Sequence, residues 1–486
     1  MLSRNAVLTR KIYTLRHFLP IGFNTRYTLH EFAPKQEEAD TEELEIMKSD
    51  RPIFKGIERA VPASSISRAF NFAKLGGSLI GGTISQAYKS GFSGSLKQHA
   101  LSEKNIEILT EGMLKMRGAA LKLGQFVSFQ DTQKLPPTLL RAMERTRREA
   151  YIMPSAQLER VLNKEIGENW RSKFDEFNME PFAAASIGQV HTGVYKGKKV
   201  AIKVQYPGVD TSINSDLNNL HMLFTWTNIL PKGLYFDALV DHTREDLINE
   251  CNYSLEAEHQ LKFKGLTKNI KGVYVPDVFE EVSTKHILVS EYVDSLVFED
   301  FSRQASQKRR DSIGTRIMEV TLREIFDWKY MQTDPNPANF QYDPEDDELD
   351  LLDFGATRTY SDQFVEKYKH VVVSGVKKDR EGVLHWSNEI GYFKNDEAAE
   401  LYDAHVNACF AVGEPFSTPG LYDFGNQGIT PQVYKQMPTM MQHRKCPPPP
   451  ETYTLHRKLS GVYLLCMKLR AKVPAHDLFN KIVLKL

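Results

Sequence analysis

The stretch YMQTDPNPANFQYDPEDDELDLLDFGATR, residues 330–358, decides the fold because it places three oxygen-bearing side chains at a diagnostic spacing. Asn339 follows Asp334 by five residues, and an Asp-Phe-Gly sequence begins fourteen residues later, at Asp353. In kinase-type enzymes one Asp orients the attacking group, while an Asn five residues on and the Asp of Asp-Phe-Gly hold Mg²⁺. Amide and carboxylate oxygens are the ligands that this hard cation prefers. We therefore predict that Asp334 is catalytic and that Asn339 and Asp353 bind Mg²⁺.

The segment between the two metal-binding motifs has the pattern of a β-hairpin. Residues 340–342 and 349–352 alternate as short strands do, and the acidic residues 343–348 form the turn between them. Each motif alone would also arise by chance, but their order around a hairpin favours a metal site. Protein kinases commonly carry a Lys two residues after the catalytic Asp, where this chain has Asn336. That difference disfavours an orthodox protein kinase.

The composition excludes several classes of protein. The chain has 486 residues, 41% of them hydrophobic, which is enough for two or three domains with ordinary cores. Its 62 basic and 62 acidic residues balance, so the chain has no overall basic excess of the kind that nucleic-acid binding usually needs, and we expect no nucleic-acid partner. Its 4 cysteines form no CxxC pair, which argues against a zinc site and against a disulfide framework.

The first 65 residues predict a targeting segment and a linker. Residues 1–30 contain Arg and Lys with Ser and Thr but no acidic residue before Glu31, which is typical of a mitochondrial presequence. A disordered basic tail is the alternative. Residues 31–65 are rich in acidic residues and predict a solvated linker.

Residues 66–150 predict a helical extension. Its first part, 66–88, is apolar but too short between its lysines to span a bilayer, which takes about 20 residues. Its glycines favour either membrane association or simple flexibility. Residues 102–129 predict an amphipathic helix that carries the sequence KLGQ, whose Lys122 and Gln125 share one face. Both side chains could equally be solvated helix residues.

Residues 181–204 predict two strands joined by a turn, in the arrangement that kinases use to bind nucleotide phosphates. The second strand contains VAIK, which would aim Lys203 at the α- and β-phosphates. Where a protein kinase has a glycine-rich loop, the chain has a loop of alanines and a serine, so we expect this loop to approach ATP differently. Its predicted nucleotide-binding residues are Ala183, Ala184, Ala185 and Ser186.

A helix predicted over residues 243–263 supplies acidic partners for the lysines. Glu250 and Glu256 lie six residues apart, about 240° around one helix, so they cannot face the same partner. We predict that Glu256 pairs with Lys203 and that Glu250 pairs with Lys122. Solvated helix acids are the alternative interpretation.

Two further segments complete the pattern. Residues 289–293 predict a strand and linker, with Glu291 and Val293 as candidates for contacts with the adenine edge. Beyond residue 361 the chain is mainly helical, including a helix over residues 453–469. There Arg457 and Lys458 could face acidic lipid or a protein partner.

Several motifs together resemble the UbiB family of atypical kinase-like proteins, and most closely its mitochondrial branch in coenzyme Q biosynthesis. The resemblance covers residue 68 to the C-terminus. It rests on KLGQ at 122–125, SFQD at 128–131, AAASIGQVH at 183–191, VAIKVQYPGV at 200–209, ECNYSLEA at 250–257, TDPNPANF at 333–340, LLDFGA at 351–356 and PPPPETYTLHRKLSGVYLLC at 447–466.

The resemblance implies an α+β fold with two kinase-like lobes, residues 151–293 and 294–486, and a family-specific N-terminal helical extension. It implies ATP or ADP and Mg²⁺ as ligands, ATPase activity, and peripheral association with lipid at the matrix face of the mitochondrial inner membrane. Enzymes of coenzyme Q biosynthesis are the implied partners, and a homodimer remains open. The extension would place its KxGQ motif over the substrate site, with Lys122 and Gln125 as inhibitory residues. The family pattern Glu-x-Asp becomes Glu250-x-Asn252 here, which predicts a looser hold on Lys122.

These features support two functional hypotheses. The first is a Mg²⁺-dependent ATPase, or a small-molecule or lipid kinase, that supports coenzyme Q biosynthesis. The second is a non-enzymatic, nucleotide-gated scaffold of the biosynthetic complex, suggested by the alanine loop and the KxGQ motif. A kinase acting on proteins is disfavoured because the glycine-rich loop is missing.

Overall fold

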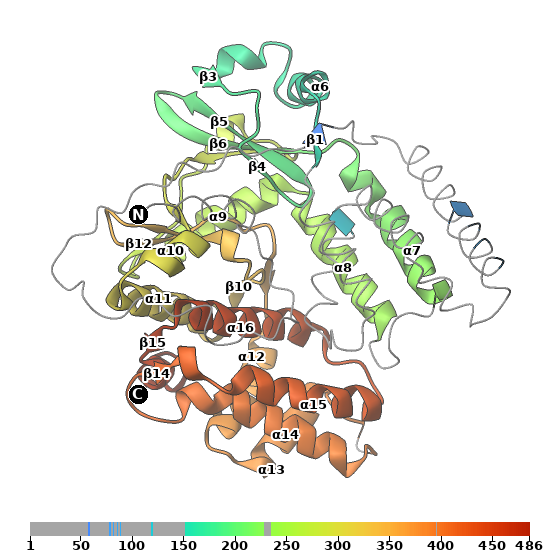
Figure 1. The fold of residues 1–486 in the computed structure, drawn as a ribbon, viewed down its shortest axis with the longest axis vertical. Coiled ribbons are helices and arrows are strands. Elements are labelled where there is room, and N and C mark those ends of the chain that lie inside the picture. The colour runs from blue at the N-terminus through green and yellow to red at the C-terminus, as the bar shows by residue number, and fades with distance from the viewer. Residues whose placement is uncertain are drawn as a thin grey trace, which may run out of the picture.

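The computed structural model describes residues 57–58, 77–78, 81, 85, 88, 118–119, 151–227, 235–394 and 396–486. Within these ranges a sheet with flanking helices forms one half of the molecule, and a larger, mainly helical half lies beneath it (Figure 1). The predicted presequence and most of the predicted linker and helical extension lie outside the described residues. The α+β class is confirmed, whereas the predicted domain boundaries stay predictions.

The upper sheet has the strand order β3-β5-β6-β8, with β4 also pairing with β5. All its pairs are antiparallel, and β6 lies between β5 and β8, with Lys203 opposite Val190 on one side and Leu288 on the other. The predicted strand-turn-strand unit is therefore confirmed. The bounds are β3 Glu176–Phe177, β4 Ala183–Ala184, β5 Gly188–Tyr195, β6 Lys198–Gln205 and β8 Ile287–Glu291.

The core of this half packs helix α6 (Ser155–Ile166) and the 3₁₀ turn Trp170–Lys173 against one face of the sheet. The β5 residues on the buried face are polar as well as apolar. His191 and Gln189 are both fully buried, and they bond to each other at 2.9 Å. Gln189 also accepts from the backbone of Met153, and His191 bonds to the carbonyl of Asn178. Because each buried polar group has a partner, this polar core costs little stability.

The second sheet contains the predicted hairpin. Its order is β7-β12-β11-β9, and β11 pairs with β12 in an antiparallel register that sets Phe340 opposite Leu351. The hairpin prediction is confirmed, with strands one residue different from those expected. The bounds are β7 Val273–Tyr274, β9 Leu296–Val297, β11 Phe340–Asp343 and β12 Glu348–Leu351, and a separate antiparallel pair joins β10 Tyr330–Gln332 to β13 Thr357–Thr359.

The single helix predicted over residues 243–263 is wrong. The structure has two helices, α8 (Phe236–Glu250) and α9 (Tyr253–Thr267), which break at Cys251 and Asn252. The Asn252 side chain caps α9 by accepting from the backbone of Leu255, as Asn does at helix N-termini. Helix α7 (Val209–Thr227) lies beside α8 (Figure 1).

The lower half is built from helices around one large apolar core. Helices α11 and α12 begin at polar caps, where a side-chain oxygen satisfies a free backbone N–H group: Ser306 caps α11 and Ser361 caps α12. The bounds are α10 Phe298–Gln304, α11 Gln307–Phe326, α12 Asp362–Val376, α13 Arg380–Ile390, α14 Ala399–Gly413, α15 Ile429–His443, α16 Pro450–Leu469 and α17 Ala475–Phe479.

Short elements complete this half. These are the 3₁₀ turns Pro337–Asn339, Glu414–Phe416 and Phe424–Asn426, the short π-helix Asn480–Leu484, and the strand pair β14 Tyr422–Asp423 with β15 Lys472–Val473, whereas the 3₁₀ turn Glu280–Val282 packs against β8 in the upper half. A parallel two-residue pair joins β1 Ile57–Glu58 to β2 Tyr151–Ile152.

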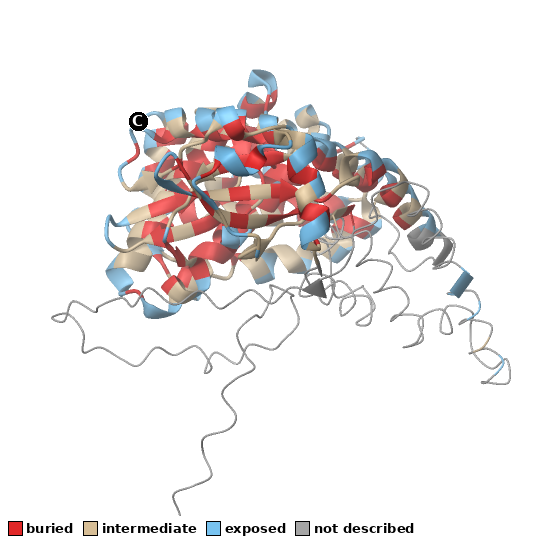
Figure 2. Ribbon diagram, turned by 90° about the horizontal axis from the view of Figure 1, so that it is seen from above, coloured by how far each residue is buried: buried red, intermediate tan, exposed pale blue. Residues whose placement is uncertain are grey.

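Helix α16 occupies the centre of the molecule, between the upper half and helices α12 to α15 (Figure 1). Most of its residues are buried. Buried residues fill the interior of the described part of the molecule, and exposed residues lie toward its outer edges (Figure 2). Among the helices that the structure describes, none is both long and apolar enough to cross a membrane.

Candidate functional site

Three predicted residues meet where the two halves of the molecule face each other. Lys203 lies on β6, and its Nζ is 2.8 and 2.9 Å from the two carboxylate oxygens of Glu256 on α9. The same Nζ lies 3.5 Å from Oδ2 of Asp353, which follows β12. The structure therefore brings together a lysine from the upper sheet, an acid from the helix beneath it, and the acid of the Asp-Phe-Gly sequence.

The charges of this cluster differ in exposure. Glu256 is 1% exposed, whereas the side chain of Asp353 is 37% exposed. Burial opposes the charged form of Lys203, but Asp353 and Glu256 outweigh it and raise its pKa well above the usual value. Burial raises the pKa of Glu256 to about 7, with Lys203 acting in the opposite direction. Lys203 therefore stays protonated and positively charged, and Asp353 presents the accessible carboxylate of the cluster.

The loop that carries Asp334 is folded onto itself. Asn339 ends a 3₁₀ turn, and its Nδ2 donates to the backbone oxygen of Asp334 at 3.2 Å. The side chain of Asn336 accepts from the backbone of Ala338 and so caps this turn. Asn336, which stands where protein kinases have a lysine, therefore has a local structural role in this chain.

The hairpin connects Asn339 to Asp353. The backbone N–H of Leu352, the residue before Asp353, donates to the carbonyl of Asn339 at 3.2 Å. Asp353 is held in turn, because its Oδ1 accepts from the backbone of Gly355 at 3.0 Å. The two predicted metal ligands thus stand on neighbouring backbone segments, as the sequence predicted.

The donor set fits a Mg²⁺ ion that is completed by phosphates. Within the described ranges no group of three or more His, Cys, Asp or Glu forms a metal cage. Mg²⁺ in phosphoryl-transfer sites takes only one or two protein oxygens and draws the rest from phosphates and water. One accessible carboxylate at Asp353 and one amide at Asn339, beside the Lys203 cation, match that requirement.

The alanine loop is tied down by backbone and side-chain bonds. Ala183 and Ala184 pair with β5, and the backbone N–H of Ala185 donates to the carbonyl of Gly188 at 2.9 Å. A Cβ on Gly188 would lie 2.5 Å from the carbonyl oxygen of Val204, so this close approach to β6 requires glycine. The hydroxyl of Ser186 donates to Glu250 at 2.6 Å.

The predicted KxGQ contacts fall outside the described residues, because Lys122 and Gln125 are not described. Two helical residues just before them are described, and Ala119 is buried. A Cβ on Gly118 would lie 2.7 Å from the side chain of Ile187 in the alanine loop. The pairing of Glu250 with Lys122 stays a prediction, and Ser186 is a partner of Glu250 that sequence reasoning missed.

The predicted adenine contacts lie at the end of β8. Glu291 is the last residue of that strand, and Val293 lies in the linker beyond it. The Glu291 carboxylate accepts from the hydroxyl of Tyr274 at 2.5 Å and from the backbone of Asp277 at 3.2 Å. The Glu291 side chain is thus engaged with protein groups, and the adenine contacts of Glu291 and Val293, which were expected from backbone groups, stay predictions.

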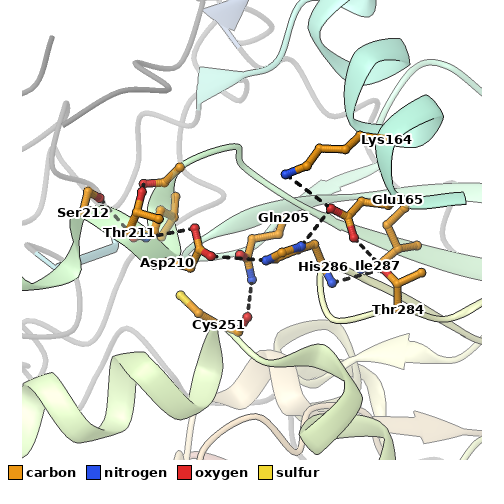
Figure 3. Close-up of polar contacts among 12 residues, drawn as sticks. Lys164, Glu165, Gln205, Asp210, Thr211, Ser212, Cys251, Thr284, His286 and Ile287 are labelled. Atoms are coloured by element: carbon orange, nitrogen blue, oxygen red, sulfur yellow. Dashed lines mark hydrogen bonds and ion pairs between the residues drawn. The ribbon is translucent and has the colours of Figure 1, made fainter. Parts of the chain in front are cut away.

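The break between α8 and α9 is fixed to the upper sheet. Figure 3 shows Gln205, two residues after Lys203, donating to the carbonyl of Cys251 at 3.0 Å. In the same view His286 lies between Glu165, at 2.9 Å, and Asp210, at 3.4 Å. Because the junction between α8 and α9 is fixed, α9 places Glu256 beside Lys203 and α8 places Glu250 beside the alanine loop.

Sequence reasoning was wrong about Arg457 and Lys458. Both are buried, at 3% and 2% exposure, so neither faces lipid or a partner. Lys458 forms an ion pair with Glu324 on α11 at 2.9 Å, and Arg457 donates to the backbone oxygen and the hydroxyl of Thr333. The apolar residues around them on both sides of α16 were the signal that this helix is buried.

The comparisons with known proteins agree with this geometry. The family model described as the ABC1 atypical kinase-like domain matches residues 145–387. The chain is 42% identical to the mitochondrial atypical kinase COQ8 of Schizosaccharomyces pombe over 426 residues, covering 86% of this chain and 70% of that protein. It is 41% identical to the mitochondrial atypical kinase COQ8 of Saccharomyces cerevisiae over 430 residues, covering 87% and 85%.

A solved structure supports the fold. The structure of the Rv3197–erythromycin complex from Mycobacterium tuberculosis aligns with a TM-score of 0.54 and 24% identity, covering 68% of this chain and 83% of that one. The kinase-like fold predicted from the sequence is confirmed. On its sequence and its fold, the chain belongs to the ABC1 atypical kinase-like family, the UbiB family.

Proposed function

We propose that the protein is a Mg²⁺-dependent ATPase of the mitochondrion, or a kinase acting on a small molecule or lipid, and that it supports coenzyme Q biosynthesis. The mitochondrial names of its relatives and the basic composition of residues 1–30 support the location. We further propose peripheral association with the matrix face of the inner membrane and partnership with enzymes of coenzyme Q biosynthesis.

The observation that carries the proposal is the contact of Lys203 with both Glu256 and Asp353. In kinases this lysine and glutamate form the ion pair that orients the phosphates, and the acid of Asp-Phe-Gly completes the metal site. Burying charged groups costs desolvation energy. A chain that only bound a partner would therefore have no need for the buried Glu256 carboxylate beside the protonated Lys203.

Each residue of the site would have a separate role in binding ATP or in the transfer of its phosphate. Lys203, oriented by Glu256, would bind the α- and β-phosphates of ATP, and the alanine loop with Ser186 would cover them. Bound Mg²⁺ would neutralise charge on the phosphates, held by Asp353 and by the amide oxygen of Asn339, whose nitrogen already donates to the loop. Asp334 would orient the attacking water or hydroxyl group.

The test is phosphate release by the full-length protein with Mg²⁺ and ATP, with and without vesicles of mitochondrial phospholipids. We expect activity in the wild type and at least about a hundredfold less in Asp334→Asn, the scale at which positioned acid–base groups contribute. Asp334→Asn should retain binding of ADP with Mg²⁺. Wild-type activity no higher than that of Asp334→Asn in every condition would refute the ATPase.

The scaffold hypothesis is separated by the same variant in cells. If Asp334→Asn binds nucleotide and fully restores coenzyme Q in cells that lack the protein, nucleotide binding alone is sufficient and the scaffold is favoured. If it fails to restore coenzyme Q although it binds nucleotide, the chemical step is required.

A further inference from the structure

Helix α8 contacts the site at two places, one turn apart. Its last residue, Glu250, accepts from Ser186 of the alanine loop. Four residues earlier, Asp246 lies on the same side of the helix and is only 4% exposed. The structure therefore gives one rigid helix a contact with the predicted phosphate-binding loop and a second, buried contact elsewhere.

The buried contact joins α8 to the strand after the Asp-Phe-Gly sequence. Oδ1 of Asp246 accepts from Nε and Nη2 of Arg358, at 2.9 and 2.6 Å. Arg358 lies on β13, opposite Met331 of the strand that leads into the catalytic loop. Burial opposes the charge on Arg358, but Asp246 outweighs it and raises the pKa of the guanidinium. One carboxylate oxygen thus accepts two N–H groups of a single guanidinium, which is a charge-assisted contact.

The same carboxylate also lies near Arg457, the residue of α16 that bonds to the start of the catalytic loop. Oδ2 of Asp246 is 3.7 Å from Nη2 of Arg457, on helix α16. Arg457 in turn donates to the backbone oxygen of Thr333 at 3.1 Å and to its hydroxyl at 2.9 Å, and Thr333 immediately precedes Asp334. Thr333 also donates, through its backbone and its hydroxyl, to the carbonyl of Ala356.

Asp246 therefore lies within 3.7 Å of two arginines, one on β13 and one on α16. One arginine is in the strand that follows Asp353, and the other bonds to the residue before Asp334. Arg457 is buried and Arg358 is 20% exposed, and removing the carboxylate from this network leaves two cations with less compensation. Thr333, the residue before Asp334, is thus linked through Arg457 to a residue of α8.

We propose that Asp246 is a positioning residue, and that α8 couples the alanine loop, through Glu250 and Asp246, to the loop that carries Asp334. This inference rests on the proposed function for its effect on turnover, but not for its effect on the loop itself. A movement of the alanine loop onto a nucleotide would act on α8 through Glu250, and α8 is the helix whose Asp246 contacts the two arginines near the Asp334 loop.

The first test is hydrogen–deuterium exchange of the full-length protein without nucleotide, comparing wild type with Asp246→Asn. We expect exchange in residues 330–340 to rise about tenfold in the variant, because the charged contacts of Asp246 with Arg358 and Arg457 are weakened. Exchange in α11, which packs in the same core, should not change. Unaltered exchange in residues 330–340 would overturn the inference, whether or not the protein hydrolyses ATP.

The second test is the kinetics of ATP hydrolysis. We expect kcat of Asp246→Asn to fall about a hundredfold, the cost of displacing a catalytic group by about 1 Å, while KM for ATP stays within about twofold. A purely structural loss would lower the amount of active protein and leave kcat per folded molecule unchanged. That result, or equal changes in kcat and KM, would count against positioning. An inactive wild type would refute the ATPase proposal, and the exchange experiment would still decide this inference.

Matched variants guard against misfolding. Asp241→Asn removes an acid from the same helix, but its side chain is 79% exposed and lies 3.9 Å from Arg244, so it should behave as wild type. If Asp246→Asn does not fold, Arg358→Gln removes the other partner of this ion pair. It should produce the same rise in exchange over residues 330–340, and its failure to do so would overturn the inference.

Discussion

The ion pair between Lys458 and Glu324 allows a sharp test of the buried position of helix α16. The two side chains are 2% and 1% exposed, and Nζ lies 2.9 Å from the carboxylate. Nζ also donates to Gln332 at 3.3 Å. In Lys458→Met the apolar stem of the side chain is kept, so the change removes little except the charge. Breaking a buried pair by removing one partner costs about 3–5 kcal/mol, and we expect the free energy of unfolding to fall by that amount.

The loss should depend on pH. Burial raises the pKa of Glu324, while Lys458 lowers it, so removing the lysine raises this pKa further. A carboxyl whose pKa is raised on folding contributes stability at low pH and loses it as the pH rises through the folded-state pKa. The deficit of Lys458→Met should therefore be smaller at about pH 5 than at about pH 8.

The assay is urea unfolding at both pH values, followed by intrinsic fluorescence. Lys468→Met serves as a control on the same helix, because Lys468 is 31% exposed and 3.8 Å from Glu299, and it should change stability by less than about 0.5 kcal/mol. The double variant Lys458→Met with Glu324→Gln should recover much of the loss, since no charge stays buried. A pH-independent change below about 0.5 kcal/mol in Lys458→Met would refute the burial of this pair.

Three further changes test other features. Asn252→Ala should lower the free energy of unfolding by about 1 kcal/mol in urea unfolding because it removes the cap of α9, whereas Asn252→Asp should keep it; equal losses in both would contradict the capping role. Gly461→Ala should reduce ATP hydrolysis more than it reduces nucleotide affinity, since the new Cβ would lie 2.2 Å from Pro335 beside Asp334; kinetics identical to wild type would show that this contact is easily relieved. Burial raises the pKa of Asp350 to about 7, so its contribution to stability is lost as the pH rises through that value; Asp350→Asn should flatten this decline in thermal unfolding, and an unchanged slope would exclude the group as its source.

The sequence was most informative where a short motif sets a local geometry. Asp334, Asn339 and Asp353 could be placed because fixed spacing on either side of a hairpin restricts where the backbone can go. Lys203 and Glu256 could be paired because a strand lysine needs a nearby acid. The structure brings these last two within hydrogen-bonding distance.

The sequence was least informative where long-range packing decides the outcome. The helix over residues 243–263 looked continuous because nothing between Glu250 and Tyr253 forbids helix, but Asn252 accepts a cap bond and the bond of Gln205 to Cys251 fixes the break. Arg457 and Lys458 looked like surface cations because their partners lie more than 120 residues away in the chain. No local pattern records such pairings.

The place of helix α16 determines when the site can be completed during synthesis. Arg457 bonds to Thr333 across 124 residues of sequence, and Gly461 packs on Pro335. During translation the β11–β12 hairpin is therefore synthesised well before helix α16, against which the Asp334 loop packs. A premature stop codon or a proteolytic cut after residue 449 would leave Lys203, Glu256, Asp334, Asn339 and Asp353 in a polypeptide that lacks the helix against which the Asp334 loop packs.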